Sequence, residues 1–167
     1  MAKRSVSITS ITPTATADTT NLVDATYPFL LKGGSSTQLN KISEISMGGL
    51  AGASAPTIMI LGRDSTVAAT NSLGTGQTDA ALDAATAALA APAQTGNTNT
   101  TKPQRSATLH LLNLSFNAFG GQVLWQAAPG QEINTVGNTA SLGEVSLSAF
   151  TGGTPGLLGA HMLYESM

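Results

Sequence analysis

The alternation of apolar and polar residues along the chain predicts a protein made of β-strands. Its longest apolar stretch, residues 107–127, has the pattern of two strands joined by a turn at Gly120 and Gly121. Alternate residues of a strand point to opposite faces, and here both faces are largely apolar. The stretch also contains the single tryptophan, and a large aromatic side chain contributes strongly to burial. We therefore expect this hairpin at the centre of the core. Its predicted core residues are Leu109, Leu111, Phe116, Val123 and Trp125.

Shorter segments with strand-like patterns lie on both sides of this hairpin. They are residues 27–32, 41–50, 57–63, 133–136, 141–150 and 157–166. Glycine and proline residues separate them, which is typical of turns between antiparallel strands. About seven or eight such strands favour an all-β fold, an antiparallel β-sandwich of the jelly-roll type. A chain of 167 residues is expected to form one such domain.

Residues 64–104 differ from the rest because they are rich in Ala, Thr, Gly and Asn and contain almost no large apolar residues. Connections between strands usually span about 4–6 residues, so this segment is a long insertion. Within it, Thr78 could cap a short Ala-rich helix or helical turn that has Asp79 in its first turn and ends before Pro92. The insertion is either a solvent-exposed excursion or a lid or intersubunit contact.

Residues 1–26 are predicted to be an extended N-terminal arm outside the β-sandwich domain, which spans residues 27–167. The arm is rich in Thr, Ala and Ser and has few large apolar residues. It is either a frayed terminus or a segment that orders against a neighbouring subunit through main-chain hydrogen bonds. In the second case, the contact residues are Lys3, Arg4, Val6, Ile8 and Ile11.

The composition argues against several classes of partner. Only 10% of the residues are charged and the net charge is -2, whereas binding to nucleic-acid phosphates needs clustered Lys and Arg. The first residues lack the apolar run of a secretory signal, and no stretch reaches the roughly 20 apolar residues of a membrane helix. The absence of cysteine excludes disulfides and thiolate ligands. We therefore expect synthesis in the cytoplasm and no nucleic-acid or membrane partner.

No arrangement of residues predicts an active site. His110 and His161 lie in apolar strand patterns, and no acidic residue stands at a short strand spacing from His110. His161 and Glu165 share a face, but four residues of strand separate them by about 13 Å. Asp79 and Asp83 are a close acidic pair, without the Gly and Glu that a calcium loop requires. We expect no enzyme activity, no catalytic residue, no cofactor or metal and no small-molecule substrate.

Two segments carry a resemblance to a known family. They are residues 26–65, which include TYPFLLKGGSSTQLNKISEISMGGL, and residues 100–132, TTKPQRSATLHLLNLSFNAFGGQVLWQAAPGQE. Both resemble small structural proteins of tailed bacteriophages, in particular the capsid decoration (cement) proteins. The resemblance implies a β-rich virion protein on the capsid surface that binds the major capsid protein and stabilises its shell. It also implies self-association, often as a homotrimer. From its own composition, we expect the N-terminal arm to make the contact with capsid subunits or trimer mates.

Other functions are compatible with the same fold, since one fold hosts many functions. The protein could be a structural component of a phage tail or baseplate. It could also be a carbohydrate-binding β-sandwich module or an enzyme on a jelly-roll scaffold. A sugar site needs exposed aromatic side chains beside carboxylates or amides, and the candidates are Trp125, Tyr27 and Tyr164, each of which already has a place in a strand pattern.

Overall fold

The computed structural model describes most of the chain, and within it the regular secondary structure is β-strand. The described residues are 3–11, 29–66, 71–72, 79–86, 94–96, 98–99, 104–137, 142–151, 153–154 and 156–167. The strands are β1 (Lys3–Ile11), β2 (Phe29–Lys32), β3 (Leu39–Leu50), β4 (Pro56–Thr66), β5 (Asn71–Ser72), β6 (Ala80–Ala81), β7 (Gln94–Gly96), β8 (Thr98–Asn99), β9 (Gln104–Asn117), β10 (Phe119–Gln126), β11 (Ile133–Val136), β12 (Val145–Thr151) and β13 (Leu158–Ser166).

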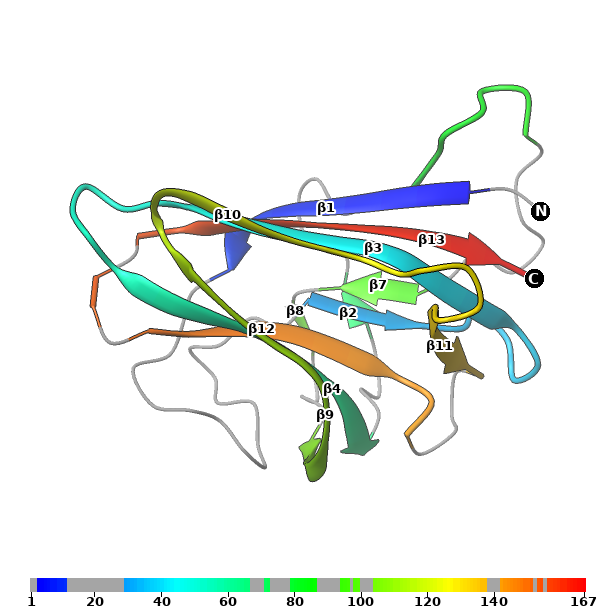
Figure 1. Cartoon of the computed structure of the whole chain (residues 1–167). Coiled ribbons are helices and arrows are strands. Elements are labelled where there is room, and N and C mark those ends of the chain that lie inside the picture. Colours follow the sequence, from blue (N-terminus) through cyan, green and yellow to red (C-terminus); the bar gives the residue numbers. More distant parts are fainter. Residues whose placement is uncertain are drawn as a thin grey trace.

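Two antiparallel sheets pack against each other (Figure 1). Sheet A has the order β10-β3-β13-β1-β6, with β11 also paired to β3, and sheet B has the order β7-β2-β12-β4-β9. Eight strands form the framework of the sandwich: β1, β3, β10 and β13 lie in sheet A, and β2, β4, β9 and β12 lie in sheet B. This is the double Greek-key arrangement of a jelly roll, so the predicted all-β sandwich is confirmed.

Among the described parts of the insertion, two strands lie at the edges of the two sheets, and β5 and β8 pair with each other in a separate two-stranded sheet. The insertion begins after β4 and ends before β9, and it contributes β6 to the edge of sheet A and β7 to the edge of sheet B. Strands that cover an edge protect it from pairing with other chains. The prediction of a helix is wrong for residues 79–86, which form β6 and a turn because the backbone at Arg4 and Ser5 offers a strand to pair with. Thr78 and Pro92 lie outside the described residues.

The first described segment, Lys3–Ile11, is an integral strand of sheet A and not a free arm. β1 pairs with β13 along its length, from Lys3 opposite Glu165 to Ile11 opposite Leu158. Val6, Ile8 and Ile11 are fully buried in the core. Buried side chains cannot contact another subunit, so the prediction that these three form an intersubunit or capsid contact is wrong. Three apolar side chains on one face suffice for a strand that a second sheet covers.

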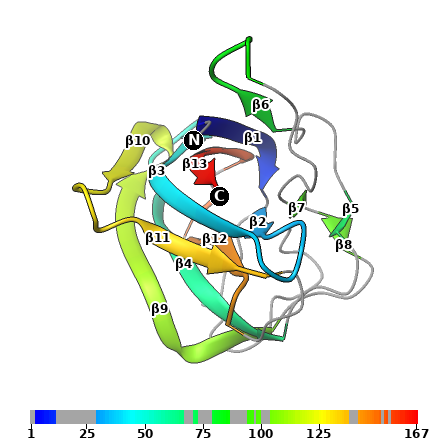
Figure 2. The same ribbon diagram turned by 90° about the vertical axis from the view of Figure 1, so that its right-hand side faces the viewer.

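The core lies between the inner faces of the central strands rather than at the β9–β10 hairpin. Its largest fully buried side chains include Tyr164, Phe29, Ile45, Met59 and Leu61. Four of the five predicted core residues pack against this core while partly buried. They are Leu111, Phe116, Val123 and Trp125. The hairpin runs from β9 at the edge of sheet B to β10 at the edge of sheet A (Figure 2). Its partly buried side chains therefore cover the side of the core.

The fifth predicted core residue, Leu109, is 38% exposed, so its placement in the core is wrong. Leu112, Leu114 and Phe116 share the inward face of β9, so alternation places Leu109 on the opposite face, which is not covered there. The register is also irregular in this part of β9. Gly62 pairs with His110 and Asp64 with Arg105, so Leu109 lies between them without a partner residue on β4.

The position of the core can be tested with two alanine substitutions. Phe29→Ala removes a fully buried ring and should destabilise the protein by about 3–5 kcal/mol. Leu109→Ala removes a partly exposed side chain at the side of the sandwich and should cost less than about 1 kcal/mol. Urea unfolding followed by circular dichroism measures both values. Similar losses for the two variants would place the core at the hairpin after all.

The place of β1 in sheet A predicts the effect of an N-terminal truncation. Deleting residues 2–11 removes a strand that pairs with β13 and the buried side chains of Val6, Ile8 and Ile11. Each buried aliphatic side chain contributes about 1.5–3 kcal/mol, which together is comparable to the net stability of a domain. The truncated chain should lack a cooperative thermal transition. A truncated protein with an unchanged melting temperature would mean that β1 is dispensable.

Candidate functional site

The two histidines lie on different sheets, and among the described residues an ion pair with an acidic side chain is found for His161 alone. His161 Nδ1 on β13 lies 3.9 Å from Glu44 Oε1 on β3, and Gln126 donates a hydrogen bond of 2.8 Å to the other oxygen of Glu44. The acidic partner comes from the adjacent strand, which spacing along the chain could not reveal. Within the described residues, no group of three or more His, Asp and Glu side chains is placed to hold a metal ion.

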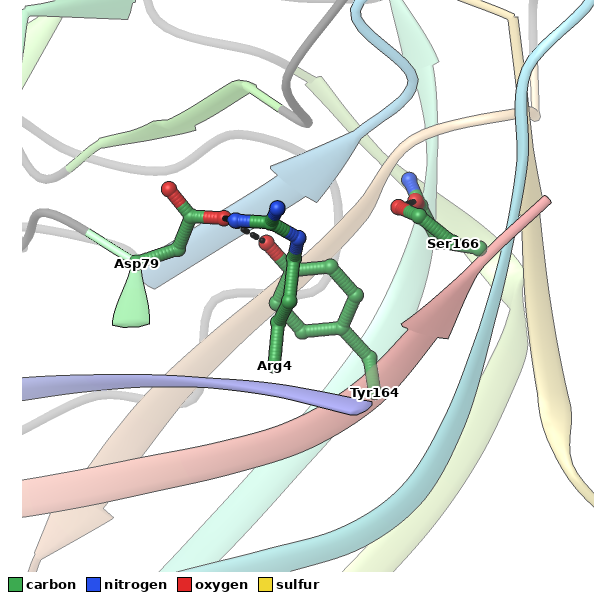
Figure 3. Close-up of polar contacts among 5 residues, drawn as sticks. Arg4, Asp79, Tyr164 and Ser166 are labelled. Atoms are coloured by element: carbon green, nitrogen blue, oxygen red, sulfur yellow. Dashed lines mark hydrogen bonds and ion pairs between the residues drawn. The ribbon is translucent and has the colours of Figure 1, made fainter. Parts of the chain in front are cut away.

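A buried polar cluster joins the insertion to the sandwich (Figure 3). Asp79 Oδ2 accepts hydrogen bonds from Arg4 Nη1 at 2.9 Å and from the Tyr164 hydroxyl at 3.1 Å. Arg4 is buried and paired inside the protein, so the prediction that it contacts a partner is wrong. Lys3, which precedes it, is exposed. The cluster therefore fixes β6 against β1 and β13.

A second polar group closes the same end of the core. Ser166 donates a hydrogen bond to Asn40 Oδ1, and Asn40 Nδ2 donates one of 3.1 Å to Thr135 Oγ1. All three residues are buried. Because buried polar groups must be hydrogen-bonded, this arrangement fixes the relative positions of β3, β11 and β13.

The Tyr164 hydroxyl predicts a loss of stability at alkaline pH. Burial, and then the Asp79 carboxylate, raises the pKa of Tyr164 well above its usual value of 10.0. Above about pH 10 the unfolded chain releases this proton while the folded protein keeps it, so stability is present below that pH and falls as the pH rises. The Tyr164→Phe variant has no hydroxyl to titrate at this position. Its free energy of unfolding should therefore fall less between pH 8 and pH 11 than that of the wild-type protein. Urea unfolding at both pH values measures the difference, and equal losses would contradict the assignment.

A row of buried charges crosses the outer face of sheet B. Lys32 Nζ lies 3.8 Å from Glu144 Oε2, and Ser146 donates a hydrogen bond of 2.7 Å to Asp64 Oδ1. The backbone N–H of Asp64 bonds the carbonyl of Glu144, so these two acids are direct cross-strand neighbours. Charges are costly to bury unless they are paired, and pairs of this kind fix strand register more than they add stability. We assign this row a structural role.

Three large apolar side chains are exposed together at one end of the sandwich. Leu50, Phe119 and Leu157 are 86%, 57% and 52% exposed, and we call them the loop-end patch. Phe119 lies opposite Leu50 in the β10–β3 register, and the backbone N–H of Leu50 bonds the carbonyl of Leu157. The turns after β3, β9 and β12 come together at this end, on the left of Figure 1. Exposed apolar residues that cluster are typical of contact surfaces.

The backbone beneath the loop-end patch is firmly held. Asn117 Oδ1 accepts hydrogen bonds from the N–H groups of Ala55 and Phe119, at 2.9 and 3.0 Å. Ala118 bonds through its backbone to both Ala51 and Ala55. At Gly49 a Cβ atom would come within 2.6 Å of the Ala118 side chain, so only glycine fits there. The patch is therefore preorganised, which reduces the entropy that binding would cost.

A shallow hollow of about 380 Å³ adjoins the loop-end patch. Its lining includes Gly48, Gly120, Gly121, Gly159, Leu50 and Leu157. A Cβ at Gly48 would make ordinary van der Waals contact with the Gly121 carbonyl oxygen at 3.5 Å, whereas a Cβ at Gly120 would meet no atom within 4 Å, so the hollow is open beside Gly120. The hollow can therefore accept an apolar side chain from a partner.

A larger groove of about 490 Å³ lies at the opposite end, between β9, β11 and the segment that precedes β12. We call it the side groove. Its lining includes Leu39, Arg63, Leu109, Leu111, Val136 and Leu142. Arg63 Nη1 donates hydrogen bonds to the carbonyls of Asn134 and Leu142, at 2.9 and 3.0 Å, and partial burial lowers the pKa of Arg63.

Sequence reasoning missed both surfaces. The signal for the loop-end patch is a large apolar residue next to a glycine pair at a turn, as at Leu50 and Phe119. The side groove has no such signal, because its residues come from four distant segments. Comparison with protein-family models, curated proteins and solved structures found no match for this chain. In the part of the chain that the structure describes, no helix is long and apolar enough to cross a membrane.

Proposed function

We propose that this protein is a virion structural protein, a decoration protein that attaches to the outer surface of a phage capsid and stabilises its shell. The observation that carries the proposal is the loop-end patch, an exposed and preorganised apolar surface on a rigid β-sandwich. The resemblance of residues 26–65 and 100–132 to decoration proteins supports the same function. The partner is then the major capsid protein, and no catalytic step is involved.

The size of the patch fits attachment to a repetitive shell. Burying one leucine or phenylalanine side chain fully contributes roughly 1.5–3 kcal/mol, and part of this is offset by the loss of freedom on association. Three such side chains therefore support a single contact of modest affinity. On a shell that presents many identical sites, several linked contacts bind far more tightly than one. A weakly charged surface gives little electrostatic steering, so the apolar contact decides where the protein binds.

Substitution of the patch tests this function. Leu50→Ser and Phe119→Ser should each weaken binding to capsids that lack the protein by roughly tenfold or more, because each removes apolar area at the contact. The folds should be unaffected, since both side chains are exposed. Leu124→Ser is the matched control, because Leu124 is also exposed but lies on the outer face of sheet A. Sedimentation of the protein with capsids, quantified by mass spectrometry, measures the binding.

The same measurement separates this function from its alternatives. If the wild-type protein does not bind capsids, the proposal fails. If it is found on purified tails and not on heads, it is a tail or baseplate component. If it binds capsids and the patch variants bind equally well, the patch is not the contact surface.

A further inference from the structure

The side groove contains a positive charge, that of Arg63, for which the described residues provide no acidic partner. Arg63 reaches from β4 across to β11, where its guanidinium donates hydrogen bonds to two backbone carbonyls. None of the ion pairs among the described residues includes Arg63. The walls beside it are aliphatic, with Leu109, Val136 and Leu142 partly exposed. The groove is therefore complementary to a group that combines an aliphatic side chain with a carboxylate.

The backbone at the rim of this groove is strained. Leu142 has a φ of 63°, in the left-handed region that residues other than glycine rarely adopt. Its N–H bonds the carbonyl of Asp64, and its own carbonyl accepts the hydrogen bond from Arg63. Strained backbone of this kind persists only where surrounding contacts hold it, and it is concentrated at binding sites.

The insertion presents such a group on a projecting turn. Leu82 is 57% exposed, and Asp83 beside it is also exposed. Asp83 Oδ1 accepts a hydrogen bond of 2.9 Å from the N–H of Ala85, and the N–H of Thr86 bonds the carbonyl of Asp83. The turn is therefore preformed. In Figures 1 and 2 this green segment projects from the body beyond β6.

We infer that the turn of residues 82–86 docks into the side groove of a second copy of this chain. Leu82 lies against the aliphatic walls, and the Asp83 carboxylate pairs with the guanidinium of Arg63. Charge complementarity favours this turn as the occupant of the groove. Among the described residues, neither Asp83 nor Arg63 forms an ion pair within its own chain. Docking also covers Leu82 and Leu109, which a single copy leaves exposed.

The contact joins two different surfaces and therefore continues from copy to copy. Figure 2 shows the turn above β1, whereas β9 and β11 lie on the other side of the sandwich. A copy that docks by its turn leaves its own groove free for the next copy. Such head-to-tail contacts close into a ring, in which every copy makes two contacts, or form an open filament. The inference concerns self-association in solution and does not depend on capsid binding.

A double-mutant cycle tests the charge pair. Asp83→Asn removes the charge but keeps the side-chain oxygen that accepts the Ala85 N–H. Arg63→Gln removes the opposite charge, and Arg63→Lys retains it. Asp83→Asn and Arg63→Gln should each weaken self-association of the full chain by roughly tenfold. The double variant should associate no more weakly than either single variant. Arg63→Lys should weaken self-association less than Arg63→Gln does. Sedimentation equilibrium measures the association, with Leu124→Ser as the control that leaves it unchanged.

Cysteine cross-linking tests the placement without relying on stability. The natural chain has no cysteine, so any disulfide that forms must join the introduced cysteines. A tagged Leu82→Cys protein mixed with an untagged Leu109→Cys protein should form a disulfide-linked pair under mild oxidation, because a disulfide requires Cβ atoms about 3.5–4.5 Å apart. The pair of Leu82→Cys with Leu124→Cys serves as the matched control and should form little product.

Three results would overturn the inference. The wild-type chain could sediment as a monomer at high micromolar concentration. Association could occur while Asp83→Asn and Leu109→Ser leave it unchanged, which would place the interface elsewhere. The groove variants could lose capsid binding without any effect on self-association, which would give the groove to a different partner.

Discussion

The pairing of the first described strand with the last one is the constraint on which the rest of the structure depends. β1 lies beside β13 at the middle of sheet A, so the sheet cannot be completed before the C-terminal strand is available. Contacts between residues so distant in sequence make folding slow and strongly cooperative. The inner faces of these two strands supply Val6, Ile8, Met162 and Tyr164 to the core. The Arg4–Asp79–Tyr164 cluster exists only because this pairing brings Arg4 opposite Tyr164.

The two ends of the sandwich have different physical characters as a result. At the end with the C-terminus, the buried polar groups Asn40, Thr135 and Ser166 close the core, and the Arg4–Asp79–Tyr164 cluster holds the insertion. At the other end, backbone hydrogen bonds around Asn117 hold short turns that expose apolar side chains. Rigid turns on a β framework are the usual place for recognition, because the framework sets their positions.

Much of the fold can be predicted from the local alternation of apolar and polar residues in the sequence. The loop-end patch and the side groove cannot be predicted in this way. Val145, Leu147 and Ala149 alternate with small polar residues, and they do face the core. Alternation does not show which face of β9 is covered, so the prediction for Leu109 is wrong, and alternation gives no warning that Tyr164 is a central core residue. The sequence pattern predicts Asp79 in the first turn of a helix, but Asp79 accepts hydrogen bonds from Arg4 and Tyr164 instead. These are tertiary contacts, which helix propensity cannot anticipate. Likewise, Arg63 and Asp83 become complementary only through their positions in the fold.

The two proposed contacts are geometrically compatible. The projecting turn and the side groove lie at the end of the sandwich opposite the loop-end patch, as Figure 1 shows for the turn and β11. Copies related by rotation about an axis along the length of the sandwich would therefore keep all their loop-end patches on one side of the ring. Several patches that face one surface would bind a repetitive shell together, with an affinity well above that of a single patch. Self-association would then strengthen attachment without occupying any part of the attachment surface.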